Sequence, residues 1–200
     1  MKTLNSRCVA AVILSCFAIQ FLPATHEWFR YDRWAILHGE CWRLFTGHVV
    51  HFSTAHLFVN ITAFAVISLL PSNRRLGQSW LFLTSGMLFI STALLLLRPG
   101  MAFYAGLSGI VSLVVWDFAV SGFIATPKHR TFFLCVIMML AAKLGFEFAS
   151  GRSVALSFKH GVAAEPVAHL LGALFAIGWA LFSLCYRHIP PRPRLSCAMK

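Results

Sequence analysis

Charged side chains are scarce in this 200-residue chain, and acidic ones are the scarcest. Lys, Arg, Asp and Glu together make up 12% of the residues, and only six residues are Asp or Glu. This share is roughly half of what soluble globular chains carry. Hydrophobic residues reach 58%, including 19 Phe and 6 Trp, which is more apolar surface than a soluble fold of this size can bury. The composition therefore excludes an ordinary soluble domain and indicates a multispan membrane protein.

The six cysteines form neither a disulfide framework nor a CxxC metal-binding pattern. Four of them fall inside or at the edges of apolar runs: Cys8, Cys16, Cys135 and Cys185. The other two, Cys41 and Cys197, are predicted on opposite sides of the membrane, so they cannot pair within one chain. We expect buried thiols that pack as small apolar groups. Internal repeats and low-complexity tracts are also lacking.

Six apolar runs have the length that a helix needs to cross a hydrocarbon core of about 30 Å. They cover about residues 6–22, 52–70, 80–97, 101–125, 132–148 and 162–186. We predict an all-α bundle of six transmembrane helices, forming a single domain over residues 1–200, with a long external loop at 23–51 and no soluble appendage. The first run also resembles a cleaved signal peptide, but no small-x-small cleavage motif follows it, so we expect a retained span.

The distribution of basic residues predicts the orientation of these spans. With six spans both termini lie on one side, and that side has ten basic residues and no acidic one: Lys2, Arg7, Arg74, Arg75, Lys128, Arg130, Arg187, Arg192, Arg194 and Lys200. Elsewhere seven basic residues accompany all six acidic ones, so only +1 of the net charge of +11 lies there. The positive-inside rule then places both termini in the cytoplasm. The basic excess is explained by topology, and we expect no nucleic-acid partner.

Three of the predicted spans contain polar residues near their external ends, where such residues usually mark a path or a reactive centre. They are His56 and Asn60 in the second span, Gly106, Ser108 and Gly109 in the fourth, and His169 and Gly172 in the sixth. Each cluster alone also suits a hydrogen bond between helices or a seam of small residues. Their similar predicted depth favours one shared site.

The small residues suggest how that site forms. Glycines beside Ser108 and after His169 let the fourth and sixth spans approach closely, which brings the Ser108 hydroxyl within reach of the His169 ring. This is the minimum for an activated serine nucleophile. His56, Asn60 and the backbone amide of Ser108 would supply an oxyanion hole. Since no acidic residue is obviously placed as a third partner, a Ser–His dyad is the simpler prediction.

A metal site is the main chemical alternative, because His48, His51 and His56 lie close together in the sequence. No HExxH motif and no nearby Glu accompany them. His51 lies about 140° around a helix from His56, so it is expected to serve the junction of loop and helix. We therefore expect neither a metal nor a cofactor.

The ordered motifs resemble those of the rhomboid intramembrane serine proteases over about residues 30–178. The matching segments are Trp42-Arg43 in the external loop, His51, His56 and Asn60, then Gly106-Leu107-Ser108-Gly109, and finally Ala168-His169-Leu170-Leu171-Gly172. The resemblance implies Ser108 as nucleophile, His169 as general base, and His56, Asn60 and the Ser108 amide as oxyanion donors. Two positions depart from the family pattern: Ser112 stands where a ring often packs on the catalytic histidine, and Ala176 replaces a glycine.

Further segments resemble the rhombosortase branch of the family: Arg30-Tyr31-Asp32-Arg33, the run 42–48, Lys143-Leu144 with Glu147, and the acidic residue shortly before His169. In that branch the implied partners are exported bacterial proteins with a C-terminal transmembrane segment and a Gly-Gly sorting signal. The enzyme would lie in the bacterial inner membrane with its site open to the periplasm. Two alternatives are a catalytically silent relative that binds or escorts membrane segments, and a small transporter, which the lack of inverted repeats disfavours.

Two other features suggest supporting roles. Trp42 and Arg43 lie in a loop rich in aromatic residues, which we interpret as a rigid collar at headgroup level, with Arg43 donating hydrogen bonds to loop carbonyls. Lys143 and Glu147 are one helical turn apart in the fifth span and are expected either to neutralise each other or to gate the substrate.

Overall fold

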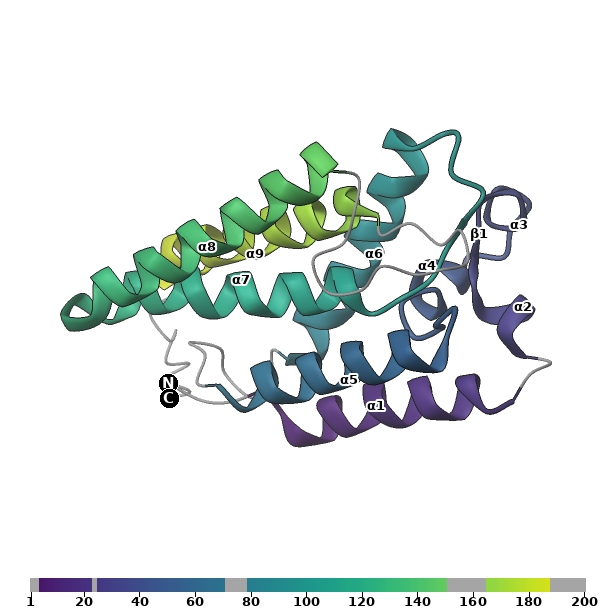
Figure 1. Cartoon of the computed structure of the whole chain (residues 1–200), viewed down its shortest axis with the longest axis horizontal. Coiled ribbons are helices and arrows are strands. Elements are labelled where there is room, and N and C mark those ends of the chain that lie inside the picture. The colour runs from purple at the N-terminus through teal and green to yellow at the C-terminus, as the bar shows by residue number, and fades with distance from the viewer. Residues whose placement is uncertain (1–3, 23–24, 71–78, 151–164, 188–200) are drawn as a thin grey trace, which may run out of the picture.

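The computed structural model describes residues 4–22, 25–70, 79–150 and 165–187, and these residues are almost entirely helical. Six longer helices form the bundle in Figure 1: α1 (Ser6–Gln20), α5 (Thr54–Leu69), α6 (Ser79–Leu97), α7 (Ser108–Ala125), α8 (Arg130–Ser150) and α9 (Pro166–Arg187). The shorter elements are α2 (Thr25–Phe29), β1 (Tyr31–Asp32), α3 (Arg33–Leu37), α4 (Arg43–Thr46), β2 (Phe103–Tyr104) and the 3₁₀ turn η2 (Pro127–His129).

Four of the long helices are long and apolar enough to cross a membrane within the described residues: α6, α7, η2 continued by α8, and α9. The other two, α1 and α5, are apolar but have only 15 and 16 residues. They coincide with the first two predicted spans, so each predicted span corresponds to one helix. The chain is therefore a helical, multi-pass membrane protein with four clear spans, while the prediction of six remains a prediction.

The largest difference from the predicted boundaries is at the start of the fourth span. The apolar run begins at Met101, but α7 begins at Ser108. The preceding residues are extended because β2 pairs antiparallel with β1, with Tyr31 opposite Tyr104. Residues 162–164, predicted to open the sixth span, lie outside the described residues.

The short elements α2, β1, α3 and α4 gather at one end of the bundle (Figure 1). Local sequence explains their boundaries: Asp32 caps α3 by accepting a hydrogen bond from the Ala35 amide, and Ser53 caps α5 through the His56 amide. Two further backbone hydrogen bonds join this layer to the chain before α7, from Arg33 to Ala102 and from Gly106 to Gly47. The loop layer is thus fixed to the segment that leads into Ser108.

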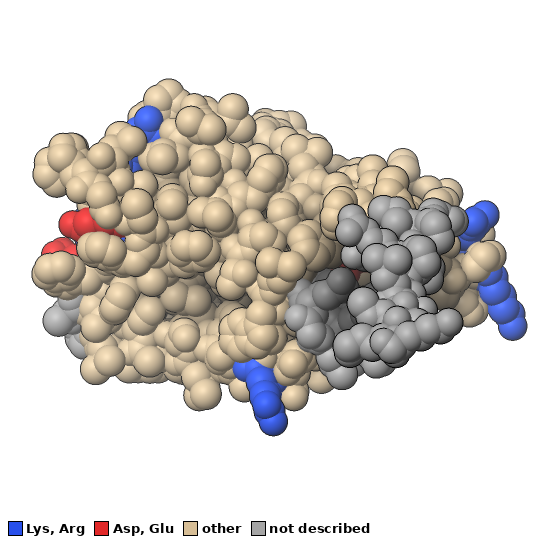
Figure 2. All heavy atoms as spheres, turned by 180° about the vertical axis from the view of Figure 1, so that it is seen from behind, with Lys and Arg blue, Asp and Glu red and all other residues tan. Residues whose placement is uncertain are grey.

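The outside of the bundle is apolar. Large hydrophobic side chains such as Leu69 and Leu96 are 74% exposed. Figure 2 shows a face covered almost entirely by uncharged residues, with charged side chains only at a few places near its margins. This surface suits a lipid environment. The start of α1 and the end of α9 lie at the same end of the bundle (Figure 1), opposite the loop layer.

Candidate active site

Helices α7 and α9 make the most extensive helix–helix contact of the described structure, and glycine allows it. A Cβ atom at Gly172 would lie 2.4 Å from the Gly109 carbonyl oxygen and 3.0 Å from the Leu113 amide nitrogen. A Cβ at Gly109 would lie 3.3 Å from the carbonyl oxygen of Ala168. The residue after Ser108 therefore meets the residue before His169, and the N-terminal turns of the two helices are in direct contact.

His169 is nearly fully buried, and both its backbone carbonyl and one ring nitrogen have a defined partner. Its carbonyl oxygen accepts a hydrogen bond from Ser112 Oγ at 2.8 Å. Its ring atom Nδ1 lies 2.8 Å from Glu147 Oε2. Ser112, which stands where a ring packs in the resembled family, thus fixes the backbone of His169, and Glu147 holds its imidazole.

The contact with Glu147 was not anticipated from the sequence, which favoured a Ser–His pair without an acidic partner. The Lys143–Glu147 pair was anticipated: Lys143 Nζ lies 2.7 Å from Glu147 Oε1, with a Lys143 side chain 37% exposed and a Glu147 side chain fully buried. One signal in the sequence could have predicted the contact between Glu147 and His169. A carboxylate in a span needs partners, and a histidine in a neighbouring span can be one of them.

His56 and Asn60 lie against Gly106, two residues before Ser108. Gly106 has a φ of 134°, a conformation that favours glycine. A Cβ atom there would lie 2.7 Å from His56 Cε1 and 3.7 Å from Asn60 Nδ2. The His56 ring is also close enough to His169 to interact with it electrostatically. The second predicted cluster therefore borders Gly106 and lies within electrostatic range of His169.

Ser108 is the first residue of α7 and is partly exposed. Its side chain neighbours the buried hydroxyl of Tyr104, which donates a hydrogen bond to the Gly106 carbonyl at 3.0 Å. No role for Tyr104 was predicted from the sequence. As the first residue of a helix, Ser108 offers a backbone amide without an intrahelical acceptor, which suits a nearby oxyanion.

The two histidines before α5, His48 and His51, are buried and make packing or hydrogen-bond contacts that hold the structure together. His48 Nε2 is within hydrogen-bonding distance of the Met87 carbonyl, 3.1 Å, and of Ser91 Oγ, 2.9 Å, so it joins the loop layer to α6. His51 packs its ring against His56 with centroids 5.1 Å apart. Burial lowers the pKa of His48 to about 4, and burial together with the nearby His56 lowers that of His51 to about 3. Within the described ranges, no three His, Cys, Asp or Glu side chains are grouped to bind a metal.

Arg43 is buried at the start of α4 and fastens the loop layer. It contacts Glu40 at 2.6 Å and donates to the carbonyls of Glu27 at 2.6 Å and Arg30 at 2.9 Å. Its neighbour Trp42 donates from Nε1 to the Trp28 carbonyl at 3.2 Å.

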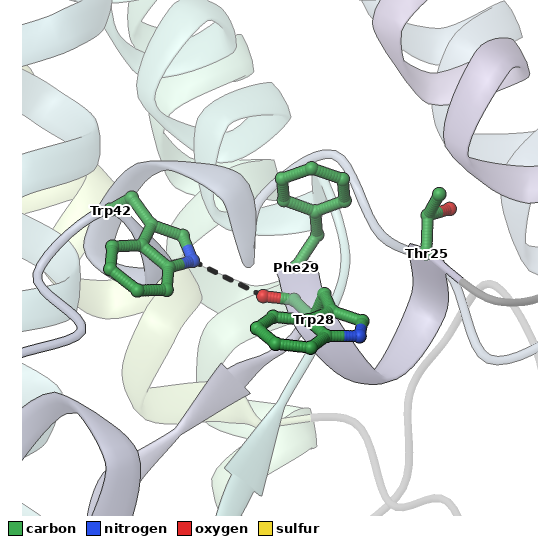
Figure 3. Close-up of a pocket in the computed structure, with 4 residues that line it drawn as sticks. All are labelled: Thr25, Trp28, Phe29 and Trp42. Atoms are coloured by element: carbon green, nitrogen blue, oxygen red, sulfur yellow. Dashed lines mark hydrogen bonds between the residues drawn. The ribbon is translucent and has the colours of Figure 1, made fainter.

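Trp42 also lines an apolar cavity of about 460 Å³ with Thr25, Trp28 and Phe29 (Figure 3). This cavity is a feature of the loop layer, and neither Ser108 nor His169 lines it.

Comparison with known proteins agrees with this architecture. A search of curated proteins finds no match to the chain. The family model for the Rhomboid domain matches residues 38–186, a stretch that begins in the loop layer and ends in α9. Because the match covers most of the sequence, with the polar residues on α5, α7 and α9 inside it, this chain belongs to the rhomboid family, whose members are intramembrane serine proteases acting on membrane proteins within the lipid bilayer.

Proposed function

We propose that this chain is a serine endopeptidase in which Ser108 and His169 form the reacting pair. The contact between Gly172 of α9 and the Gly109 carbonyl of α7 carries the proposal, because it brings together the helical turns that bear the two residues. Membership of the rhomboid family supports the reaction type.

The chemistry follows from the residue types. Ser108 Oγ attacks the scissile carbonyl carbon as its proton passes to the His169 ring, and the carbonyl electrons move to the oxygen. His169 then returns the proton to the leaving amine as the C–N bond breaks. Water hydrolyses the resulting acyl-enzyme by the same route and frees Ser108.

The oxyanion formed in each step needs hydrogen-bond donors. His56, Asn60 and the Ser108 amide are the proposed donors. The first two support this role by bordering Gly106, two residues before the nucleophile. Six residues are proposed as supports that hold the loop layer and the helices in place: Trp42, Arg43, His51, Gly106, Gly109 and Gly172.

We further propose a membrane-anchored substrate that is exported across the bacterial inner membrane and carries a C-terminal span preceded by Gly-Gly. Glycine unwinds readily from a helix, which exposes the scissile bond. The rhombosortase-like segments of the sequence support this choice. The basic residues on the side of the termini support a site that opens to the periplasm.

Co-expression with a chimeric substrate tests the proposal. The substrate is a reporter domain followed by Gly-Gly, an apolar span and a basic tail, and release of the reporter is followed by gel mobility. We expect cleavage by the native chain and loss of about 10³-fold or more in Ser108→Ala and His169→Ala. Two matched controls should cleave at the native rate: Ser15→Ala, whose hydroxyl bonds within α1, and His38→Ala on the exposed side of the loop layer.

Three outcomes separate the possibilities. Cleavage that persists in both Ser108→Ala and His169→Ala contradicts the reacting pair. A native chain that retains the substrate in pull-down without cleaving it favours the escort function. Cleavage that is indifferent to replacing Gly-Gly by Leu-Leu contradicts the sorting-segment substrate while leaving the protease intact.

A further inference from the structure

The fully buried carboxylate of Glu147 lies in an unusual place. Helix α8 has only three buried residues in its 21: Phe133, Leu144 and Glu147. Two of these are the apolar contacts expected of a helix that borders lipid, and the third is a charge. A carboxylate is placed in such a position only with partners, because burying it unpaired is very unfavourable.

Both oxygens of Glu147 are in contact with a nitrogen. Oε1 faces Lys143 Nζ at 2.7 Å, and Oε2 faces His169 Nδ1 at 2.8 Å. The ammonium group of Lys143 balances the carboxylate charge. An ionised carboxylate only accepts hydrogen bonds, so the hydrogen in the contact with His169 belongs to Nδ1.

This assignment determines the chemistry of the other ring nitrogen. A neutral imidazole with its hydrogen on Nδ1 has a lone pair on Nε2, which is the form needed to take a proton from a serine hydroxyl. The negative charge of Glu147 also stabilises the imidazolium that forms when the proton arrives.

The other groups around His169 do not substitute for Glu147. From α7, Ser112 Oγ binds the backbone of His169 and not its ring. From α5, His56 supplies no negative charge. Before α9, Glu165 contacts Arg98 Nη2 at 3.3 Å and the Val167 amide at 3.3 Å. Glu147 is therefore the carboxylate that orients the imidazole.

We propose that Glu147 is a positioning residue that makes a third member of the Ser108–His169 pair, and that Lys143 keeps Glu147 ionised. The inference rests on the proposed protease function. During acylation the proton moves from Ser108 Oγ to His169 Nε2, the Oγ–C bond forms, and Glu147 accepts the Nδ1 hydrogen bond throughout without taking a proton. The proton then goes from Nε2 to the leaving amine as the scissile C–N bond breaks.

The kinetic test uses the full chain in detergent micelles with the chimeric substrate. In Glu147→Gln the amide no longer selects one tautomer, so kcat should fall on the order of 10³-fold with KM within about twofold of native. Glu147→Asp retains the charge, so its kcat should be at least tenfold higher than that of Glu147→Gln. Lys143→Met should lower kcat roughly tenfold, while Lys143→Arg stays near native. The matched control is Glu165→Gln, which removes the other carboxylate near α9 and should leave kcat unchanged.

A second measurement does not depend on activity or on the stability of the Glu147 variants. NMR of isotope-labelled histidine in the Ser108→Ala chain reports which ring nitrogen carries the hydrogen, and His169→Gln identifies the signals of His169. We expect hydrogen on Nδ1.

The outcomes separate the two proposals. Hydrogen on Nε2, or a Glu147→Gln chain that cleaves at the native rate while Ser108→Ala is inactive, overturns the role of Glu147 and leaves the protease intact. Equal losses in Glu147→Gln and Glu147→Asp also overturn it, because charge then has no part in the effect. Native-rate cleavage by Ser108→Ala overturns both proposals.

Discussion

Helices α7 and α8 are neighbours of similar length that are held in the bundle in different ways. Nine of the 18 residues of α7 are buried, and its partner α9 touches its backbone. Only three of the 21 residues of α8 are buried, and its exposed side chains include Met138 and Met139 at 62% and 63%. One helix is fixed by close packing along its length, and the other by a few side chains.

The difference matters for the candidate site, because both helices contribute to it. Ser108, the proposed nucleophile, lies on the tightly packed helix, and the carboxylate of Glu147 lies on the loosely packed one. Packing therefore fixes the position of Ser108, whereas hydrogen bonds to His169 and Lys143 fix the position of Glu147. A glycine-to-alanine substitution should therefore have a larger effect where α7 meets α9 than where it affects α8.

The largest effect is expected at the contact between α7 and α9. Gly172→Ala inserts a methyl group 2.4 Å from a backbone oxygen, which cannot move without moving α7. We expect a loss of about 3 kcal/mol in the free energy of unfolding. Gly178→Ala on the same helix is the control, since nothing lies within 4 Å of its Cβ position. Unfolding in mixed micelles measures both, and equal stability of the two variants would contradict the close-packing account.

Acid should weaken the loop layer before it affects the contact between α7 and α9. Burial lowers the pKa of His48 to about 4 from its usual 6.5. Above pH 6.5 both folded and unfolded chains are neutral at this ring, and below it only the unfolded chain binds the proton. The contribution of His48 to stability should therefore fall between pH 6.5 and 4 by about 1.4 kcal/mol per pH unit, or about 2 kcal/mol by pH 5, and His51 adds a loss of its own over the same range.

The comparison with His48→Asn isolates this contribution. The asparagine does not titrate, so the variant should be less stable than the native chain at pH 7 and should lose less stability on acidification. An unfolding free energy that falls equally with pH in both chains would remove His48 as the cause. The measurement is chemical unfolding in micelles at a series of pH values.

A smaller effect is expected where α7 meets α8. A Cβ at Gly122 would lie 2.2 Å from Phe133 Cε1, the end of a ring and not a backbone atom. Because a side-chain ring can shift more easily than a backbone atom, Gly122→Ala should lower the free energy of unfolding by about 1 kcal/mol. Adding Phe133→Leu should recover most of that loss. A loss as large as that of Gly172→Ala would mean that α8 is held as rigidly as α9.

The smallest effect is expected within α8 itself. Gly145 has nothing within 4 Å of its Cβ position. Gly145→Ala should leave the free energy of unfolding unchanged or raise it by about 0.5 kcal/mol, since alanine favours helix. A clear destabilisation, measured by the same unfolding assay, would reveal a contact on this face that the helix makes with another molecule.

Much of the fold was predictable because the bilayer imposes it. Apolar runs of span length gave every long helix, and the family membership inferred from the motifs on α5, α7 and α9 is confirmed by the Rhomboid domain match. The number of spans stays a prediction, because α1 and α5 are shorter than the usual crossing length. The extended segment before Ser108 was missed, since an apolar run does not reveal that a distant Tyr31 pairs with Tyr104.

The close approach of α7 and α9 was predictable from their glycines, but individual side-chain pairs were predictable only where both partners share a helix. Lys143 and Glu147 are one turn apart, so their pairing follows from helical periodicity. The contact between Glu147 and His169 joins two helices and depends on how they are rotated. Periodicity does not give that rotation, because an apolar helix in lipid has no strongly polar face to orient it. The roles of Ser108, His169, His56 and Asn60 remain proposals for the experiments above.

The pairing of β1 with β2 has a mechanical consequence. Tyr31 pairs with Tyr104, and Ala102 and Gly106 are bound to Arg33 and Gly47, so the loop layer and the strand before Ser108 form one connected piece. A force that displaces the loop layer is transmitted to the segment before Ser108 through backbone hydrogen bonds, without passing through the lipid-facing helices. Any membrane protein that displaces this loop would therefore displace Ser108 with it.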